Sequence, residues 1–596
     1  MSPRLTAATV ALVLVLAALP AAFAVASGSL VGSIPGAATD GWSSPAGRRL
    51  AGAVAVVVGV FVLQQVAGPA LRELADALGR RAEARLRSQV MVATLVPAGV
   101  AHLEDPDVAD LVRDAESVST GQATLSDAVV GMAMVSASSL AGVASAAVLA
   151  AYRWWLAAGL LGVYAVVTWV LVGQLRTTVG ALRGNTRRFR RSSYFRDLAL
   201  GTAAGKELRV FGLGSWVLER FAGEWQLAMA GFWHQQRKGR WVPVICAASV
   251  TGAQVVTHVL LARSAVAGDI DLSQLVTFAG AAAGVATVLS IGWDNLNITY
   301  GTAALPAAAA LERAVAEPRF TVGGTGAADG MPATGITLEG VNFTYPGRST
   351  PVFDGLDLTI PAGRSLAIVG VNGAGKTTLV KLLARLYDPT GGRIAVDGVD
   401  LRQVDPVAWR RRVAAIFQDF VRYELSAADN VGFGAVDHRD RGALATAAAR
   451  AGALGVVDAL PDGWDTVLSP RTPGGVDLSG GQWQRIALAR AYFAVEAGAS
   501  LLILDEPTAA LDVRAEAAFY DQFLELTEGL TTIVISHRFS TVRRADRIVV
   551  IDEGRIVESG PHDALMAEGG RYARLFGLQA AHVVGPAGDA PGGGDG

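Results

Sequence analysis

The chain has 596 residues, of which 51% are hydrophobic and 17% are charged, and its formal net charge is -2. This length exceeds one ordinary domain, and the charge gives no basic field of the kind that binds nucleic acid, so we expect no nucleic-acid partner. The single cysteine, Cys246, excludes an intrachain disulfide and a cysteine-built zinc site, and its apolar surroundings predict a small buried side chain.

Six apolar runs in the first half of the chain are long enough to cross a hydrocarbon core of roughly 30 Å. They lie at residues 5–27, 51–70, 128–151, 154–175, 241–262 and 275–293. A soluble core could explain one or two such runs but not all of them, so the sequence predicts an all-α membrane domain of six helices in a lipid bilayer. Arg4, the first run and Ala22-Phe23-Ala24 also resemble a secretory signal peptide with a cleavage site, an alternative that leaves the later spans unchanged.

Arginine in the connecting segments predicts the orientation, because cytoplasmic loops are enriched in basic residues. The segments after the second and fourth runs are the basic ones, with Arg72, Arg80, Arg81, Arg85 and Arg87 in the first and Arg183, Arg187, Arg188, Arg190, Arg191 and Arg196 in the second. We therefore expect both termini and the soluble half in the cytoplasm. Within these two segments, residues 101–107 and 205–211 mix apolar and charged side chains, as a surface that docks onto a soluble domain would.

The second half of the chain contains a predicted phosphate-binding loop. Residues 366–369 predict a buried strand that leads into a glycine-rich loop and then an apolar helix. Backbone N–H groups of such a loop turn toward phosphates, a lysine adds a point charge, and a hydroxyl can ligate Mg²⁺. The residues that we predict to bind ATP here are Gly370, Asn372, Gly373, Ala374, Gly375, Lys376, Thr377 and Thr378. Lysine occurs only at positions 206, 238, 376 and 381. Its presence in this loop fits a site that needs a compact ammonium, for which the planar guanidinium of arginine is a poor substitute.

A second buried strand, residues 501–504, ends in two carboxylates, Asp505 and Glu506. A site that hydrolyses ATP needs an acid to hold magnesium and a base beside the γ-phosphate. We predict Asp505 as the metal-side acid, together with Thr377 and Gln418, and Glu506 as the general base.

Between these elements stand Leu478, Ser479, Gly480, Gly481 and Gln482, and with them the soluble half resembles the ATP-binding cassette of ABC transporters. Ser479 and the glycines would open a helix at Trp483 and so provide a second anion-binding N-terminus. The resemblance implies ATP and Mg²⁺ as cofactors and adds functional residues: Tyr345 as the adenine-stacking aromatic, Gln418 as a sensor of magnesium and water, Asp512 in a loop that connects two sites, and His537 as the γ-phosphate switch.

The membrane half resembles that of six-helix exporters. The expected architecture is a membrane domain at 1–315 with two cytoplasmic docking segments, a glycine-rich linker at 316–335, an α/β P-loop NTPase cassette at 336–580 and a disordered tail at 581–596. One cassette with six spans makes half a transporter, so the resemblance implies a second half-transporter, in a homodimer or a heterodimer, with two ATP molecules held head to tail between Lys376 of one subunit and Ser479 of the other.

The function that follows is an ATPase coupled to export from the cytoplasm across a bacterial inner or plasma membrane. Residues 418–425 and Trp483 look similar to exporters of ribosomal peptides, which favours a peptide or small natural product, with lipids and drugs still open. An importer of metal chelates built on the exporter fold remains the alternative. Gln64, Gln65, Gln254, His258 and Asp294 could face a translocation path, although hydrogen bonds between helices explain such residues as well.

Overall fold

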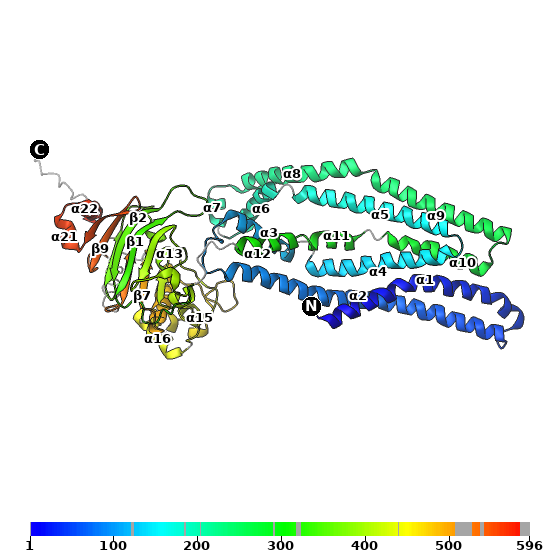
Figure 1. Ribbon diagram of the computed structural model, residues 1–596, viewed down its shortest axis with the longest axis horizontal. Helices are drawn as coiled ribbons and strands as arrows, with labels where there is room; N and C mark the ends of the chain where they lie inside the picture. The colour runs from blue at the N-terminus through cyan, green and yellow to red at the C-terminus, as the bar shows by residue number, and fades with distance from the viewer. Residues whose placement is uncertain are drawn as a thin grey trace, which may run out of the picture. The chain divides into compact units, whose positions relative to one another are not determined.

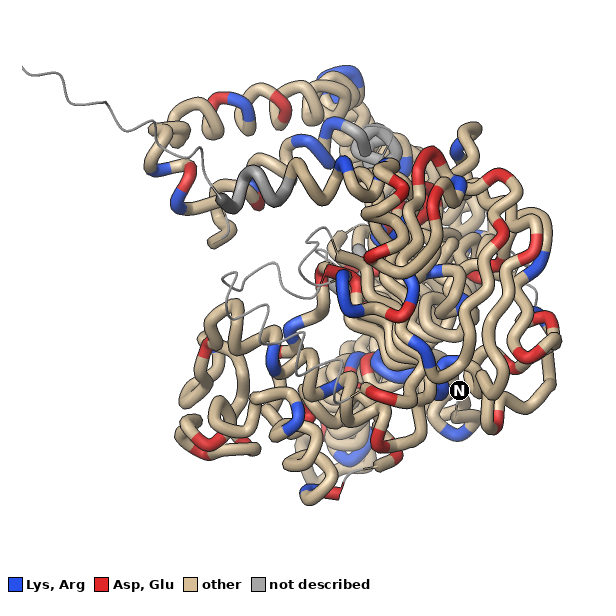
Figure 2. The backbone as a smooth tube through the Cα atoms, turned by 90° about the vertical axis from the view of Figure 1, so that its left-hand side faces the viewer, with Lys and Arg blue, Asp and Glu red and all other residues tan. Residues whose placement is uncertain are grey.

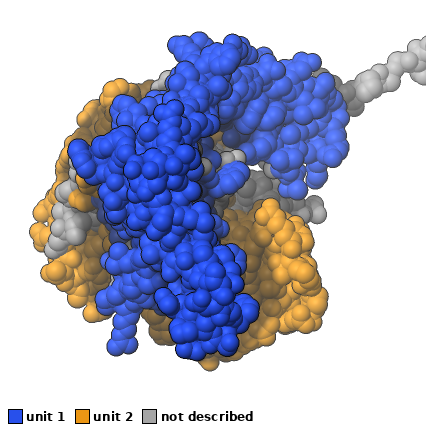
Figure 3. All heavy atoms as spheres, turned by 90° about the vertical axis from the view of Figure 1, so that its right-hand side faces the viewer, with its two compact units in different colours: residues 1–92, 110–312 blue, residues 93–109, 313–596 orange. Residues whose placement is uncertain are grey.

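The computed structural model describes residues 2–120, 124–183, 186–202, 204–289, 292–316, 324–438, 440–506, 527–536 and 542–584. The chain divides into two compact units, coloured separately in Figure 3. Unit 1 contains Met1–Val92 and Asp110–Glu312, and unit 2 contains Ala93–Ala109 and Arg313–Gly596. The short segment Ala93–Ala109 therefore belongs with the C-terminal half, although the residues on either side of it belong to unit 1.

Unit 1 is built from helices (Figure 1). In chain order they are α1 (Pro3–Asp40), α2 (Pro45–Leu95), α3 (Pro106–Thr120), α4 (Leu125–Ala150), α5 (Trp154–Arg183), α6 (Thr186–Leu200), α7 (Gly205–Val210), α8 (Gly214–Gly239), α9 (Val242–Ala267), α10 (Leu272–Val285), the 3₁₀ turn η1 (Ala286–Val288), α11 (Trp293–Gly301) and α12 (Leu305–Ala316).

Within the described residues, six helical stretches are long and apolar enough to cross a membrane, which confirms the predicted six spans. The helices extend well beyond the apolar runs, because polar residues continue the same helix outside the hydrocarbon region. Turn and capping residues separate α9 from α10. Gly268 ends α9 in the left-handed conformation with φ +81°, and the Asp271 carboxylate caps α10 by accepting a hydrogen bond from the Gln274 N–H.

Small residues let the helices of unit 1 approach closely. A Cβ added at Gly28 of α1 would lie 1.8 Å from Thr277 Oγ1 of α10, and one at Gly131 of α4 would lie 2.6 Å from the Asp294 carbonyl oxygen of α11. Helices in a membrane have no hydrophobic driving force toward one another, so close packing of this kind stabilises their association.

The polar residues of the spans make contacts between and within helices. Gln254 of α9 donates hydrogen bonds to the Tyr164 hydroxyl of α5 and to the Ala282 carbonyl of α10, each at 2.9 Å. His258 Nδ1 lies 2.8 Å from the Gln254 carbonyl of the same helix. Of the two explanations given above for Gln254, these bonds favour packing between helices. Cys246 is buried, as predicted.

Unit 2 contains two sheets among its described strands. One has the antiparallel order β2 (Phe353–Pro361), β1 (Gly335–Phe343), β4 (Gly391–Val396), β5 (Val399–Asp400). The other has the order β10 (Arg555–Gly560), β9 (Arg547–Asp552), β3 (Ser365–Val369), β8 (Thr531–Ile535), β7 (Leu501–Asp505), β6 (Val413–Ile416), and it is parallel except for the β9–β10 pair.

The helices of unit 2 surround these sheets. They are α13 (Lys376–Leu383), η2 (Leu401–Gln403), α14 (Pro406–Arg410), α15 (Ala427–Gly432), α16 (Arg441–Arg450), α17 (Leu454–Asp458), η3 (Gly463–Asp465), α18 (Gly480–Glu496), α21 (His562–Ala567) and α22 (Arg571–Val584). The helix α22 includes residues 581–584, which the sequence placed in a disordered tail. Strands β3 and β7 are almost entirely buried, because a parallel sheet is covered on both faces.

The apolar residues of unit 2 form two large hydrophobic clusters. The first joins β1, β2 and β3 to α13 and includes the fully buried Trp409, and the second joins α15, α16 and α18. Ala101, from the segment Ala93–Ala109, is 7% exposed and belongs to the first cluster. Basic and acidic residues are interspersed on the face shown in Figure 2.

Candidate functional site

The phosphate loop has the local structure that its sequence predicts. Strand β3 ends at Val369, residues 370–375 form the loop, and α13 begins directly afterwards at Lys376. Gly375 adopts φ +100°, which favours glycine, and a Cβ at Gly370 would lie 2.3 Å from the Ile551 carbonyl oxygen. The loop can therefore follow this path only with glycine at these two positions.

Lys376 is 6% exposed and lies inside the loop. Its ammonium donates hydrogen bonds to the carbonyls of Gly370 at 3.0 Å and Val371 at 3.1 Å. Burial lowers the pKa of Lys376, and the charges of Glu506 and Asp505 oppose that shift. The structure thus brings the predicted lysine close to both predicted carboxylates.

The carboxyl end of β7 carries those carboxylates. Asp505 is 1% exposed at the last position of the strand, and Glu506 follows with φ +49°. Gln418 Nε2 donates a hydrogen bond to Glu506 Oε2 at 3.1 Å. A positive φ is strained for glutamate, and such strain clusters at functional sites. Two residues predicted to act on the attacking water are therefore in contact.

The oxygen atoms in this region fit Mg²⁺ better than they fit a transition metal. The described part of the chain contains no group of three or more His, Cys, Asp and Glu that could hold a metal ion. The residues predicted to hold Mg²⁺ carry only oxygen ligands: one carboxylate on Asp505, an exposed hydroxyl on Thr377 and a side-chain amide oxygen on Gln418. Mg²⁺ takes few protein ligands of this type and completes its shell with water and phosphate oxygens.

Tyr345, predicted to stack on adenine, lies next to the phosphate-loop helix. Its hydroxyl is 3.0 Å from Thr378 Oγ1, and its ring packs edge-on against Phe343 at 4.9 Å and against Tyr387 at 5.4 Å between centroids. The side chain is half-buried. An aromatic ring is thus held beside α13 while one part of it stays accessible.

Ser479 begins a helix, but not where the sequence placed the start. The helix α18 starts at Gly480 and not at Trp483, because Ser479 is its N-cap and forms a capping box with Gln482. The Ser479 N–H donates to Gln482 Oε1 at 2.9 Å, while Ser479 Oγ accepts from the Gln482 N–H at 3.4 Å. Ser479 and Gly480 are exposed, so this helix end is open to another molecule.

Asp512 and His537 lie outside the described residues. Their predicted roles stay predictions.

Sequence reasoning missed a cluster of polar residues at the far end of α13. Lys381 Nζ lies 2.7 Å from Glu104 Oε1, and the Tyr387 hydroxyl donates a hydrogen bond to Glu104 Oε2. Lys381 also lies over the rings of Tyr345 and Tyr387, at 5.3 and 5.7 Å from their centroids. The signal was present in the sequence, because Lys381 is one of only four lysines and Glu104 lies in a predicted docking segment.

The charges in this cluster stabilise one another. Burial alone would raise the pKa of Glu104, but hydrogen bonds from Lys381 and Tyr387 lower it below its ordinary value. Burial likewise opposes the charged form of Lys381, and Glu104 raises the pKa of that lysine above its ordinary value. Backbone groups of the segment Ala93–Ala109 also bind the rest of unit 2. The Val100 N–H donates to the Leu386 carbonyl at 3.1 Å, and the Ala98 carbonyl accepts a hydrogen bond from the Arg410 guanidinium.

Residues 353–509 match the ABC transporter family. This part of the chain is a domain of the ABC transporter family. The matched residues contain the phosphate loop, the Ser479 helix and the Asp505–Glu506 pair, so the predicted ATP-binding elements lie within the match.

Curated relatives resemble the chain over the cassette. The ATP-dependent lipid A-core flippase of Thiobacillus denitrificans is 43% identical over 244 residues, which is 41% of this chain and 41% of that protein. The ABC transporter B family member 28 of Arabidopsis thaliana is 43% identical over 246 residues, which is 41% of this chain and 34% of that protein. The chain thus spans about two fifths or less of the length of these relatives.

A solved structure extends the likeness to the membrane half. A bacterial Atm1-family ABC exporter with ATP bound matches 97% of this chain and 98% of its own, with a TM-score of 0.71 and 23% sequence identity. The chain therefore has the fold of an ABC exporter half-transporter, with six membrane-length helices joined to one cassette.

Proposed function

We propose that the protein is an ATP-driven ABC exporter that hydrolyses ATP at a dimeric cassette and moves its substrate out of the cytoplasm. One observation carries the proposal. A cassette in which Lys376, Asp505, Glu506 and Gln418 converge is continuous, in one chain, with six helices of membrane length. Hydrolysis at the cassette can then do work on the membrane helices.

The proposed reaction is phosphoryl transfer from ATP to water, and each residue of the site has a role in it. Lys376 and the loop N–H groups hold the phosphates, and Glu506 takes the proton of the water that attacks the γ-phosphorus as the bond to ADP breaks. Gln418 holds the Glu506 carboxylate and that water in place. Thr377, Asp505 and Gln418 would hold Mg²⁺, which would supply positive charge to the phosphate oxygens. Asp512 and His537 complete the proposed set.

Three observations support a dimer. The helix that begins at Lys376 packs into the first hydrophobic cluster and the helix that begins at Gly480 into the second, so the two helix ends belong to different parts of the cassette. We propose that they hold one ATP across two subunits. Ser479 is exposed. The first docking segment packs on the cassette of its own chain, whereas Val210 and Phe211 in the second are 79% and 69% exposed and would be covered by a partner's cassette.

The substrate class and direction are further parts of the proposal. The relatives named lipid A-core flippases favour a lipid or another amphiphile over a peptide. We propose a bacterial inner or plasma membrane as the location, with the cassette in the cytoplasm. ATP-dependent uptake of the substrate into inside-out vesicles supports export, and uptake into right-side-out vesicles indicates the importer of metal chelates instead.

The test is Glu506→Gln in the full-length protein in lipid vesicles. We expect ATP turnover to fall by about 10²- to 10⁴-fold, the range of a general base, while ATP still binds. The control is Glu339→Gln, because Glu339 is a half-exposed cassette glutamate that pairs with Arg393 on β4. Unchanged turnover in Glu506→Gln contradicts the assigned base, and full turnover by an isolated monomer contradicts the dimeric site.

A further inference from the structure

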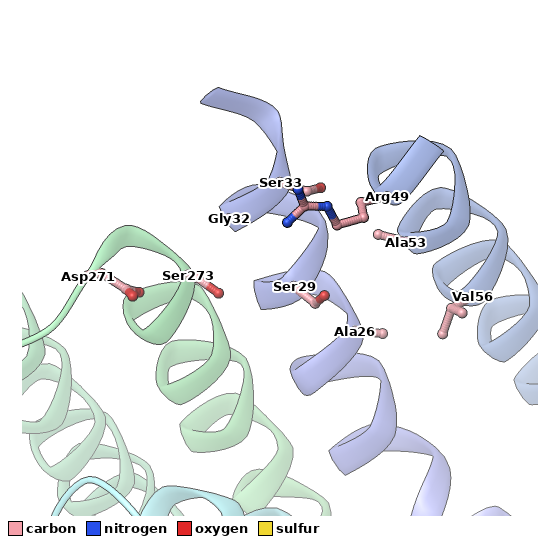
Figure 4. A pocket seen from close by; sticks show the side chains of 9 residues that line it. All are labelled: Ala26, Ser29, Gly32, Ser33, Arg49, Ala53, Val56, Asp271 and Ser273. Atoms are coloured by element: carbon pink, nitrogen blue, oxygen red, sulfur yellow. The ribbon is translucent and has the colours of Figure 1, made fainter. Parts of the chain in front are cut away.

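A cavity of about 580 Å³ opens at the end of unit 1 where α1 and α2 are joined. Three helices line it, and Figure 4 shows their side chains. The lining residues are Ala26, Ser29, Gly32 and Ser33 of α1, Arg49, Ala53 and Val56 of α2, and Asp271 and Ser273 at the start of α10. The predicted orientation places this end of the helices outside the cytoplasm. None of the residues assigned above to ATP lies here.

The polar residues gather at one end of the cavity. Figure 4 shows the Arg49 side chain reaching toward Ser33 across the space between α2 and α1, while Ala26 and Val56 lie deeper along the same helices. Seven residues separate Ser33 from Ala26 and Arg49 from Val56, which corresponds to about 10 Å along each helix. Both walls therefore change from polar to apolar over the same distance.

Arg49 is the exposed cation that lines the cavity. Among the described residues its side chain makes one hydrogen bond, from Nε to the Pro45 carbonyl at 3.4 Å, and no carboxylate lies within ion-pair distance. The terminal nitrogens of the guanidinium remain free to bind both oxygens of an anion. Ser29, exposed on the facing helix, makes no side-chain hydrogen bond within the described part of the chain and can donate to the same anion.

The other polar groups are already engaged. Ser33 Oγ donates to the Leu30 carbonyl at 2.7 Å, Ser273 Oγ donates to the Gly28 carbonyl at 2.7 Å, and the Asp271 carboxylate caps α10. These bonds fix the wall formed by α1 and α10. The one carboxylate of the lining, Asp271, lies on the α10 side and away from Arg49 in Figure 4, so an anion held between α1 and α2 meets the Arg49 guanidinium and the Ser29 hydroxyl.

The apolar end continues onto the surface of α2. One and two turns beyond Val56, the same face of α2 carries Val60 and Leu63, and Leu63 is 44% exposed. A hydrocarbon chain that starts beside Ala26 and Val56 can extend along these side chains and remain out of water. The cavity thus has the polarity of a molecule with a charged head and an apolar chain.

We propose that this cavity binds the anionic head group of an amphiphile, with its charge on Arg49 and its chain along α2. In assigning this amphiphile as cargo, the inference rests on the export function proposed above. Free phosphate is an anion of the same kind but has no apolar part to occupy the apolar end of the cavity. The experiment below distinguishes free phosphate from the head group of an amphiphile.

The experiment is photolabelling of the full-length protein in phosphatidylcholine vesicles that contain a small fraction of photoactivatable phosphatidic acid, without ATP. We expect labelled peptides from residues 26–33 and 49–62. Arg49→Gln should lower that labelling about tenfold, whereas Arg48→Gln should leave it unchanged, because Arg48 is also exposed but does not line the cavity. Val56→Trp, which fills the apolar end, should also lower it.

The outcomes separate the possibilities. Equal labelling of the Arg48 and Arg49 variants, or equal labelling by photoactivatable phosphatidylcholine, overturns the proposal. Competition by millimolar inorganic phosphate shows a site for the free anion and also overturns it. ATP turnover is measured in the same vesicles. Absent labelling of the wild type with normal turnover refutes only the head-group site, and normal labelling of the wild type without turnover refutes only the export function.

Discussion

Glu104→Gln tests whether the docked segment is held on the cassette by charge. The change removes the ion pair with Lys381 and weakens the hydrogen bond from Tyr387, and both contacts lie within unit 2. The side chains of Glu104 and Lys381 are 44% and 24% exposed, so solvent screens the pair and it contributes only about 0.5 kcal/mol. The charge-assisted bond from Tyr387, discounted in the same way, adds a similar amount. We expect a total loss of about 1 kcal/mol.

The assay is hydrogen exchange at the Val100 amide, because its hydrogen bond to Leu386 breaks when the segment lifts off. A loss of about 1 kcal/mol lowers its protection about fivefold. Glu339→Gln, which removes a cassette ion pair of similar exposure, should leave the protection unchanged. In a double-mutant cycle, Lys381→Met should cost little once Glu104 is glutamine.

The pH dependence has a definite sign. The pKa of Glu104 is lowered in the folded protein, so its contribution is complete above the unfolded value of 4.5 and is lost as the pH falls through the folded-state value. The difference in Val100 protection between wild type and Glu104→Gln should vanish when the pH is below the folded-state pKa of Glu104. Protection that stays within twofold of wild type at neutral pH, or additive effects in the cycle, would refute the reasoning.

Two further predictions concern buried contacts. Burial lowers the pKa of Lys376 below 10.5, so without nucleotide the stability of the protein should rise with pH between the folded-state value and 10.5, and Lys376→Met should flatten that rise in thermal unfolding curves. Gly28→Ala should destabilise unit 1 by about 1–3 kcal/mol, because the new Cβ would overlap Thr277 and Ser273, whereas Gly52→Ala on the open side of α2 should be neutral or slightly stabilising. Equal melting temperatures for the two alanine variants would contradict the packing argument.

The membrane spans and the phosphate loop were predictable because their signals are local. Twenty apolar residues in a row have few alternatives to a spanning helix, and a loop between a buried strand and a helix is defined by its glycines. The Gln418–Glu506 contact was predictable only through the resemblance, since no spacing rule brings together the residues that follow β6 and β7. The start of α18 was misplaced because the capping box between Ser479 and Gln482 makes Gly480 helical despite its low propensity.

The Glu104 cluster could not be predicted, since its partners are separated along the chain by 277 and 283 residues. The sequence predicted 101–107 as a docking segment and showed Lys381 as one of four lysines, but it did not predict their pairing. The cavity at Arg49 was missed for a related reason. The polarity of each helix wall is visible in the sequence, whereas the register that sets α1 opposite α2 and α10 depends on close packing at glycines such as Gly28.

The helix α13 connects the two parts of the cassette that matter most for coupling. Lys376 in its first turn holds the phosphate loop, and Lys381 in its last turn holds Glu104. A helix of eight residues is about 12 Å long and rigid, so a shift of the loop on binding ATP displaces Lys381 as well. ATP binding and docking of the segment must then affect each other equally. Suppose that ATP raises the protection of the Val100 amide by some factor in the wild type but not in Glu104→Gln. The variant must then bind ATP more weakly by that same factor. Calorimetric titration with ATP measures the second quantity, and unequal factors would show that α13 does not carry the coupling.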